Sequence, residues 1–235
     1  MKRLTISCLT LIFALSAISA QTLETIIKQH TAAMHADKLA AVKTIKITGR
    51  MSALGMDMPM TMYMKNPDKI KVTYSAGGNE MVSVFNGTKG YTVNPTSGSR
   101  QPVELTGEQL KQFQGSNLFN NELLKRYNAR QVTLEGTEDV NGSPANKLKI
   151  TTETGQPIYM FVDRKTGLIT KTTTVMGQTG ASVNLETYMS DYADINGIVL
   201  PRRTSVRISG IETAAIIFDQ IETDIPMDDS VFTAN

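Results

Sequence analysis

Apolar and polar residues alternate with a period of two over most of the chain. This period is typical of β-strands, in which successive side chains point to opposite faces of the sheet. The alternation is clear in residues 70–74, and strands are also expected at residues 81–85, 159–163, 198–209 and 212–222. Turn signals separate the runs, among them Asn86-Gly87, Asn141-Gly142 and Asn196-Gly197. The pattern predicts about ten or eleven strands in an antiparallel meander that is strongly curved or partly closed.

Two segments depart from this period and predict helices. The first has an apolar stripe with steps of three and four residues, made of Leu23, Ile26, Ile27, His30 and Met34. A helix is expected there, with Thr22 as its N-cap. The second, Gly107–Tyr127, loses the β pattern and predicts one or two short helices. The predicted fold class is mainly β (α+β), a curved antiparallel sheet with helices on its concave side.

One strand is built largely from methionine. Five of them alternate with other residues and form the methionine row: Met56, Met58, Met60, Met62 and Met64. Branched and aromatic residues are the usual choice in strands, whereas long polarizable side chains form a wall that can reshape around an apolar guest. Leaving the row in water would forfeit roughly 1.5–3 kcal/mol per side chain. The protein's own core, a lid or a ligand must therefore cover it.

The neighbouring strands are expected to continue this apolar wall. Ser52–Gly55 reads as the tip of a hairpin from which the methionine strand returns. Pro59 cannot donate a hydrogen bond to a ladder, so that part of the strand is an edge, a bulge or a frayed tip. The candidate ligand-binding residues are Ile45, Ile47, Met51, Met56, Met58, Met60, Met62, Met64, Ile70, Val72 and Tyr74.

The N-terminus predicts export. Lys2 and Arg3 precede an apolar run from Leu4 to Ala17, and Ser19-Ala20 resembles a signal-peptidase site. Residues 1–20 are therefore expected to be a signal peptide, cleaved after Ala20, and residues 21–235 a single domain. The apolar run is too short for a spanning helix.

Composition narrows the possible functions. The single cysteine, Cys8, lies inside the predicted signal peptide, so the exported chain has no thiol chemistry. Loss of Lys2 and Arg3 takes the count of Lys and Arg from 24 to 22, equal to the 22 Asp and Glu. A neutral chain without a basic run argues against nucleic acid as a partner and against electrostatic binding to membranes.

Catalytic motifs are absent from the sequence. His30 and His35 are five residues apart, a spacing that does not place them on one face of a helix. The acidic pairs Asp228-Asp229 and Glu222/Asp224 are explained by solvated turns. No nucleophile elbow, phosphate loop or zinc-protease motif is present. The chain is predicted not to be an enzyme and to need neither a metal nor a cofactor.

Copper offers a different interpretation of the methionine row. Thioethers are good ligands for Cu(I). Residues two apart on a strand have Cα atoms about 6.6 Å apart, so flexible side chains could converge on one ion. A periplasmic Cu(I)-binding protein is therefore an alternative to an apolar wall or a plain core.

An ordered set of segments resembles one protein family. The segments are the exported amphipathic helix, Lys65–Lys71, Val84–Tyr91, Val162–Ile169, Tyr192–Pro201 and Ile225–Phe232. Together they resemble the LolA-like and LolB-like outer-membrane lipoprotein-sorting proteins, in particular Bacteroidetes-type sequences. The resemblance implies an unclosed barrel whose helices shift to admit acyl chains.

The resemblance also implies a function and partners. Such proteins carry lipids or lipid-modified proteins through the periplasm, between a membrane-bound donor and an acceptor. A monomer is expected, and related folds also serve as lipid-sensing regulatory modules. LolA itself has an arginine on an early strand that fixes the helical lid. Arg50 lies near that place, but its parity puts it on the face opposite to Ile45, Ile47 and Met51, so the role is not transferred to it.

Overall fold

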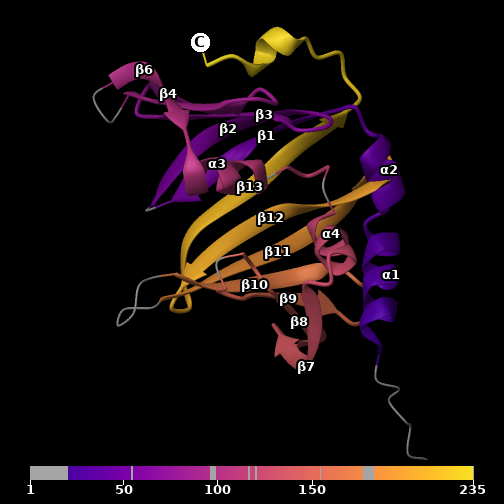
Figure 1. Cartoon of the computed structure of the whole chain (residues 1–235). Coiled ribbons are helices and arrows are strands. Elements are labelled where there is room, and N and C mark those ends of the chain that lie inside the picture. The colour runs from indigo at the N-terminus through magenta and orange to yellow at the C-terminus, as the bar shows by residue number, and fades with distance from the viewer. Residues whose placement is uncertain are drawn as a thin grey trace, which may run out of the picture.

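The computed structural model describes residues 21–53, 55–95, 99–115, 117–119, 121–153, 155–176 and 183–234. These residues form one antiparallel sheet of 13 strands in the order β6-β5-β4-β3-β2-β1-β13-β12-β11-β10-β9-β8-β7 (Figure 1). The strands are β1 Thr44–Ala53, β2 Met56–Lys65, β3 Lys69–Ala76, β4 Asn79–Phe85, β5 Gly90–Asn94, β6 Ser99–Leu105, β7 Val132–Val140, β8 Ser143–Ile150, β9 Ile158–Asp163, β10 Ile169–Met176, β11 Val183–Ile195, β12 Ile198–Ile208 and β13 Ile211–Thr223. The end strands β6 and β7 are not paired with each other, so the barrel is open.

Helices lie at the concave side of the curved sheet (Figure 1). They are α1 Leu23–Ala33, α2 Ala36–Ala41, α3 Gly107–Gly115 and α4 Glu122–Asn128. Ile26 and Ile27 of α1 and Leu123 of α4 share a buried cluster with Leu148 and Val162. Period two therefore produces the sheet, and the helical stripe covers part of its apolar face. The predicted fold class is confirmed.

The element boundaries differ from the sequence prediction in three places. The described residues contain 13 strands, two or three more than the ten or eleven expected, and β6 is one that was not predicted. The helix α2 was not predicted either; it follows His35, whose φ of 48° breaks the first helix. Glu222 lies inside β13 and pairs with Lys46 across the ladder, so it is not a turn residue.

A bulge between β1 and β13 is fixed by a glycine. The register shifts between Thr48 and Gly49, where Gly49 lies opposite Phe218. A Cβ on Gly49 would lie 2.1 Å from the Ile217 carbonyl oxygen, so no larger residue fits. Arg202 donates hydrogen bonds to the carbonyl oxygens of Phe218 (3.1 Å) and Asp219 (2.6 Å), which satisfies the backbone that the bulge leaves unpaired.

One end of the barrel, here called the helix end, is tied to α1 and α2. His30 Nδ1 donates to the Gly167 carbonyl in the β9–β10 turn (2.9 Å), and the His35 Nδ1 lies 2.8 Å from the Gly197 carbonyl in the β11–β12 turn. The Asn66 side chain donates to two carbonyls of the α2 segment. A Cβ on Gly167 would lie 2.8 Å from Gln29, so helix and turn approach as closely as glycine permits.

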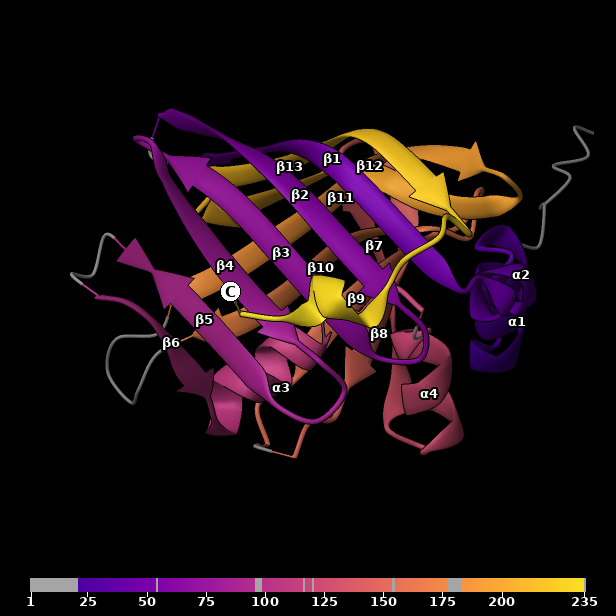
Figure 2. The same ribbon diagram turned by 90° about the horizontal axis from the view of Figure 1, so that it is seen from above.

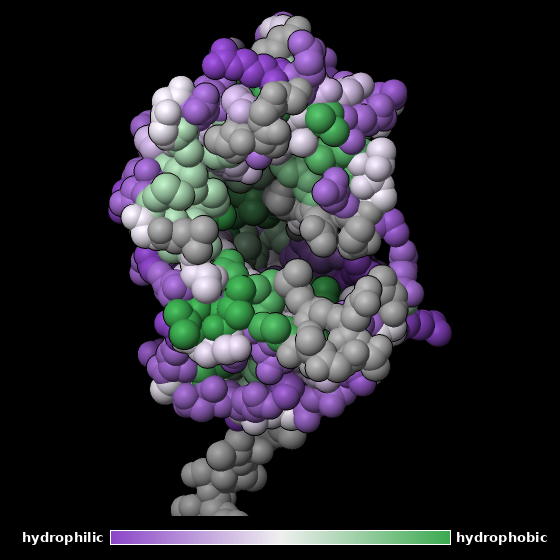
Figure 3. Space-filling view, turned by 90° about the vertical axis from the view of Figure 1, so that its left-hand side faces the viewer, coloured by the Kyte–Doolittle hydropathy of each residue, from purple (hydrophilic) through white to green (hydrophobic). Residues whose placement is uncertain are grey.

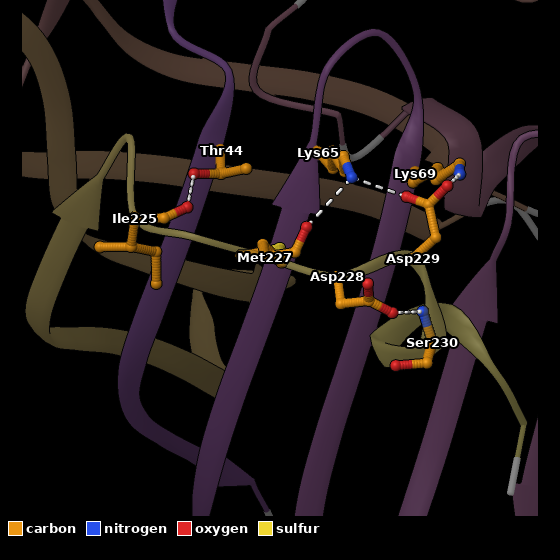
Figure 4. A network of polar contacts seen from close by, with 8 residues as sticks. All are labelled: Thr44, Lys65, Lys69, Ile225, Met227, Asp228, Asp229 and Ser230. Carbon is orange, nitrogen blue, oxygen red and sulfur yellow. Dashed lines mark hydrogen bonds and ion pairs between the residues drawn. The ribbon is translucent and has the colours of Figure 1, made fainter.

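The C-terminal segment, residues 224–234, crosses the outer face of β1, β2 and β3 as a strap (Figures 1 and 2). Lys65 Nζ binds the Met227 carbonyl at 3.0 Å and Asp229 at 2.7 Å, and Lys69 binds the other Asp229 oxygen at 2.8 Å (Figure 4). Phe232 is buried beside this network. Among the described residues, no helix has the length and apolar character to cross a membrane.

Candidate functional site

The methionine row runs from solvent into the core. Met56, at the β1–β2 tip, is 56 % exposed, whereas Met64, at the opposite end of β2, is 0 % exposed. Met58, Met60 and Met62 lie between them and are buried. Pro59 is opposite Arg50 in β1 but lies beyond the last β2–β3 pair, Met60 with Tyr74. This agrees with the predicted frayed tip and explains why a proline is tolerated there.

Most of the candidate ligand-binding residues meet in one place. Seven of them belong to a single buried cluster, here called the inner cluster: Ile45, Ile47, Met60, Met62, Met64, Ile70 and Val72. Tyr74 packs against this cluster while remaining partly exposed. Met51 is half-buried, Met58 is buried outside the cluster, and Met56 is exposed. The outer, exposed part of the predicted wall is therefore the part nearest the β1–β2 tip.

The chain itself covers the inner part of the row. Residues 107–119, here called the covering segment, supply Phe113, Leu118 and Phe119 to the same cluster. From the other side, Leu39 of α2 joins it. The expected cover was the protein's own core, a lid or a ligand. In the structure, a helical segment of the chain itself lies over the row inside the concavity.

A buried asparagine anchors the covering segment. Asn117 Nδ2 donates to the Pro67 carbonyl in the β2–β3 turn at 2.8 Å, and Asn117 Oδ1 accepts from the Phe119 amide at 2.9 Å. Its side chain is almost fully buried. Leu110 packs onto Gly90 of β5, where an added Cβ would lie 2.7 Å from the leucine. A buried amide and a close apolar contact therefore hold the segment, together with an exposed ion pair between Lys111 and Glu153 at 3.2 Å.

The sequence prediction missed several residues of this cluster. They are Leu39, Val42, Phe119, Ile198, Leu200 and Phe218. The period-two alternation of residues 198–209 could have pointed to Ile198 and Leu200. Nothing in the local pattern brings Phe218 there, because the bulge opposite Gly49 sets the face to which it points. Arg50 points outward, as its parity predicts, and forms an ion pair with Asp219 at 2.8 Å.

Two hollows among the described residues lie at opposite ends of the barrel. Figure 3 shows the end that carries the hairpin tips, where a hollow opens between apolar surfaces. A hollow of about 330 Å³ lies between the β1–β2 and β12–β13 tips, with Ala53 and Ile211 among its lining residues. A second, larger groove of about 500 Å³ separates α1 from α4 and is lined by Ile27, Leu124 and Tyr127 among others.

Titratable groups avoid the methionine row. The candidate wall contains only apolar side chains and the partly exposed Tyr74. The buried His30 belongs to the helix end, where burial lowers its pKa and the hydrogen bond to Gly167 raises it only in part. Burial also raises the pKa of Tyr192, whose hydroxyl donates to the Ile169 carbonyl at 2.6 Å. Within the described ranges, no three His, Cys, Asp or Glu side chains come together as a metal site. The wall can therefore bind a ligand by apolar contact.

Comparison with known proteins identifies the fold. No protein-family model matches the sequence, and no curated protein matches it. Among solved structures, a DUF1329 family protein from Desulfovibrio piger superposes with a TM-score of 0.61 at 14 % identity, over 88 % of this chain and 97 % of that chain. An outer membrane lipoprotein-sorting protein domain from Vibrio parahaemolyticus gives 0.58 at 10 % identity, over 88 % and 94 %. A LolA superfamily protein from Nitrosomonas europaea gives 0.54 at 15 % identity, over 91 % and 98 %. The open antiparallel barrel with its inner helices is therefore the LolA-like fold, as the resemblance of the sequence implies.

Proposed function

We propose that this protein is a non-enzymatic carrier of acyl chains, which it holds against the concave face of the barrel. The observation that supports this most directly is the methionine row beneath a separate helical cover. A rigid core would be built more tightly from branched residues, whereas methionine fills variable shapes. Because the cover is one short segment held by Asn117 and by apolar packing, a chain of CH₂ groups can replace Phe113 and Phe119 against the same wall.

The cellular setting follows from the predicted signal peptide. Residues 1–20 lie outside the described residues, so the export signal and its cleavage after Ala20 remain predictions. On this proposal, residues 21–235 act as one periplasmic domain and as a monomer. The cargo is a lipid or a lipid-modified protein, and the role is outer-membrane lipoprotein sorting between a membrane-bound donor and acceptor. The Bacteroidetes-type placement also remains a prediction.

The test pairs stability with uptake. Met60→Ala is compared with wild type by thermal unfolding and by titration with a fluorescent fatty acid. For a pliable wall we expect a loss of about 1 kcal/mol or less in unfolding free energy and a clear loss of probe affinity. Phe161→Leu, in a separate cluster with Val140 and Ala145, is the control for general loosening and should leave probe affinity unchanged. A large stability loss with unchanged uptake would make the row ordinary core.

Native mass spectrometry separates the carrier from the copper alternative. Protein purified from its own envelope should carry lipid or a lipid-modified partner. Stoichiometric copper that disappears in the Met58/Met60/Met62 triple alanine variant would instead identify a Cu(I) site. Protein that holds neither but captures a membrane partner would indicate the lipid-sensing module.

A further inference from the structure

Exposed apolar side chains gather at the hairpin-tip end of the barrel. Six large apolar side chains of the described residues are strongly exposed, and four of them lie at or beside strand ends on this side. These four form the apolar rim: Met56, Val183, Ile208 and Ile211. Ile211 is 71 % exposed, although burial of such a side chain is favourable. Figure 3 shows the hollow that opens at this end.

Two residues of the rim are held out by a tight turn. Ile208 and Ile211 are cross-strand partners at the ends of β12 and β13. Only Ser209 and Gly210 separate them, with φ angles of 51° and 81°, a turn with both central residues in the left-handed region. Cross-strand partners lie on the same face of a sheet, so the two isoleucines form one apolar knob. By strand parity this face is the concave one, since Ile208 is in phase with Thr204, which lies opposite Ile216 of the inner cluster.

The rim is continuous with the methionine row. Met56 is both the outermost residue of that row and a member of the rim. The tip that carries it borders the 330 Å³ hollow, and Ile211 borders that hollow from the other side. The small side chains of Ala53, Ala214 and Ala215 line the hollow between them, together with polar Ser52, Glu212 and Thr213, and beyond Met56 the row continues to the buried Met58 and Met60.

The knob carries little charge of its own. Arg203 is bound by Glu212 at 2.7 Å, whereas Arg207 lies over the Tyr188 ring at 4.6 Å on the outer face and keeps its positive charge. One such arginine falls far short of the clusters of basic residues that select anionic lipid. A zwitterionic phospholipid surface therefore matches the knob, whose tips insert by apolar contact.

We propose that the apolar rim is the loading port of the carrier: it inserts into a phospholipid surface, and an acyl chain passes from that surface over Met56 onto the methionine row. This inference rests on the proposed acyl-chain function. At the opposite end, by contrast, hydrogen bonds of His30, His35 and Asn66 tie the turns to the helices. Loading is therefore directional, from the hairpin tips toward Met64.

The test compares the Ile208→Ser/Ile211→Ser double variant with wild type and with Leu134→Ser. Leu134 is 37 % exposed on the edge strand β7 and is the matched control for loss of exposed apolar surface. Flotation with phosphatidylcholine vesicles measures docking without any cargo. Stopped-flow transfer of a fluorescent fatty acid from the same vesicles measures loading, and titration with the probe in water measures affinity. Unfolding midpoints confirm that all variants are folded.

We expect wild type and Leu134→Ser to float with the vesicles at low and at high salt. The double variant should lose flotation and load about tenfold or more slowly, with its affinity for dissolved probe unchanged. If the double variant loads and floats as well as wild type, the rim is not the loading port. Docking of wild type that requires anionic lipid would also overturn the proposal. If wild type binds no probe at all, the carrier function fails, and flotation alone still decides whether the rim meets lipid.

Discussion

The two ends of the barrel are built on opposite principles. At the helix end, side chains of α1, α2 and the β2–β3 turn form hydrogen bonds between helix and turn, and Gly167 allows the closest approach. At the hairpin-tip end, Gly55, Gly77 and Gly210 have no atom within 4 Å of where a Cβ would be placed, and apolar side chains face water. Satisfied polar contacts fix a structure, whereas exposed apolar surface is stabilised only when something covers it. The helix end is therefore the structurally fixed end, and the hairpin-tip end is where a binding partner is expected to cover the exposed apolar side chains.

The largest contrast should appear within a single strand. Met64→Ala removes a side chain with no exposure from the inner cluster, and core truncations of this kind cost about 2–5 kcal/mol. Met58→Ala, outside that cluster and near the tip, should cost about 1 kcal/mol or less. Urea unfolding of both variants measures the difference. Equal losses would mean that the row is uniformly packed and that the two ends do not differ mechanically.

The next largest effect concerns the anchor of the covering segment. Asn117→Ala leaves the Pro67 carbonyl and the Phe119 amide without their partner, and removal of one partner from a buried hydrogen bond costs about 1–3 kcal/mol. We expect faster hydrogen exchange in residues 107–119 and faster uptake of fatty-acid probe. Asn66→Ala, which breaks contacts of the same turn with α2, serves as control and should not speed uptake. Unchanged exchange in the covering segment would show that apolar packing alone holds it.

Acid should weaken the helix end selectively. Because the Gly167 carbonyl can only accept, His30 carries its proton on Nδ1, and burial lowers its pKa from 6.5. Between the lowered pKa and pH 6.5, His30 is protonated in the unfolded chain but neutral in the folded one. The free energy of unfolding is therefore full above about pH 6.5 and falls below it, by at most about 1.4 kcal/mol per pH unit. His30→Asn, whose Nδ2 can donate to the same carbonyl, should flatten this dependence. Urea unfolding at several pH values measures this. If wild type and His30→Asn lose stability equally as the pH falls, His30 is not the source of the pH dependence.

The smallest effect is expected at the C-terminal strap. Hydrogen bonds from Lys65 and then Lys69 lower the pKa of Asp229 to about 2. Its contribution to stability is present above about pH 4 and is lost as the pH falls toward 2, and it is small because the carboxylate is exposed. Carbon-detected NMR titration should give a midpoint near 2, and Lys69→Met should raise it. A midpoint at the ordinary value of 3.8 would mean that the strap is not held by this carboxylate.

The sequence predicted the features that depend on local periodicity and turn chemistry. Period two gave the sheet, Thr22 caps α1 as expected by accepting from the Thr25 amide, and Asn196-Gly197 forms the β11–β12 turn. The features that it did not reveal depend on tertiary contacts. The bulge at Gly49 that turns Phe218 inward exists only because β1 and β13, far apart in the chain, lie side by side. Likewise, the pairing of Asn117 with Pro67 joins residues 50 positions apart.

The two unpaired edges have a mechanical consequence. In a closed barrel, strand number and stagger fix the diameter, because every strand is bonded on both sides. Here β6 and β7 remain unjoined. Pro102 in β6, and Glu135, Glu138 and the bulge at Gly136 in β7, discourage the addition of another strand. The interior can therefore widen by a change in twist shared over 13 strands, without breaking any ladder hydrogen bond. On the proposed function, one such barrel would accommodate different numbers of acyl chains.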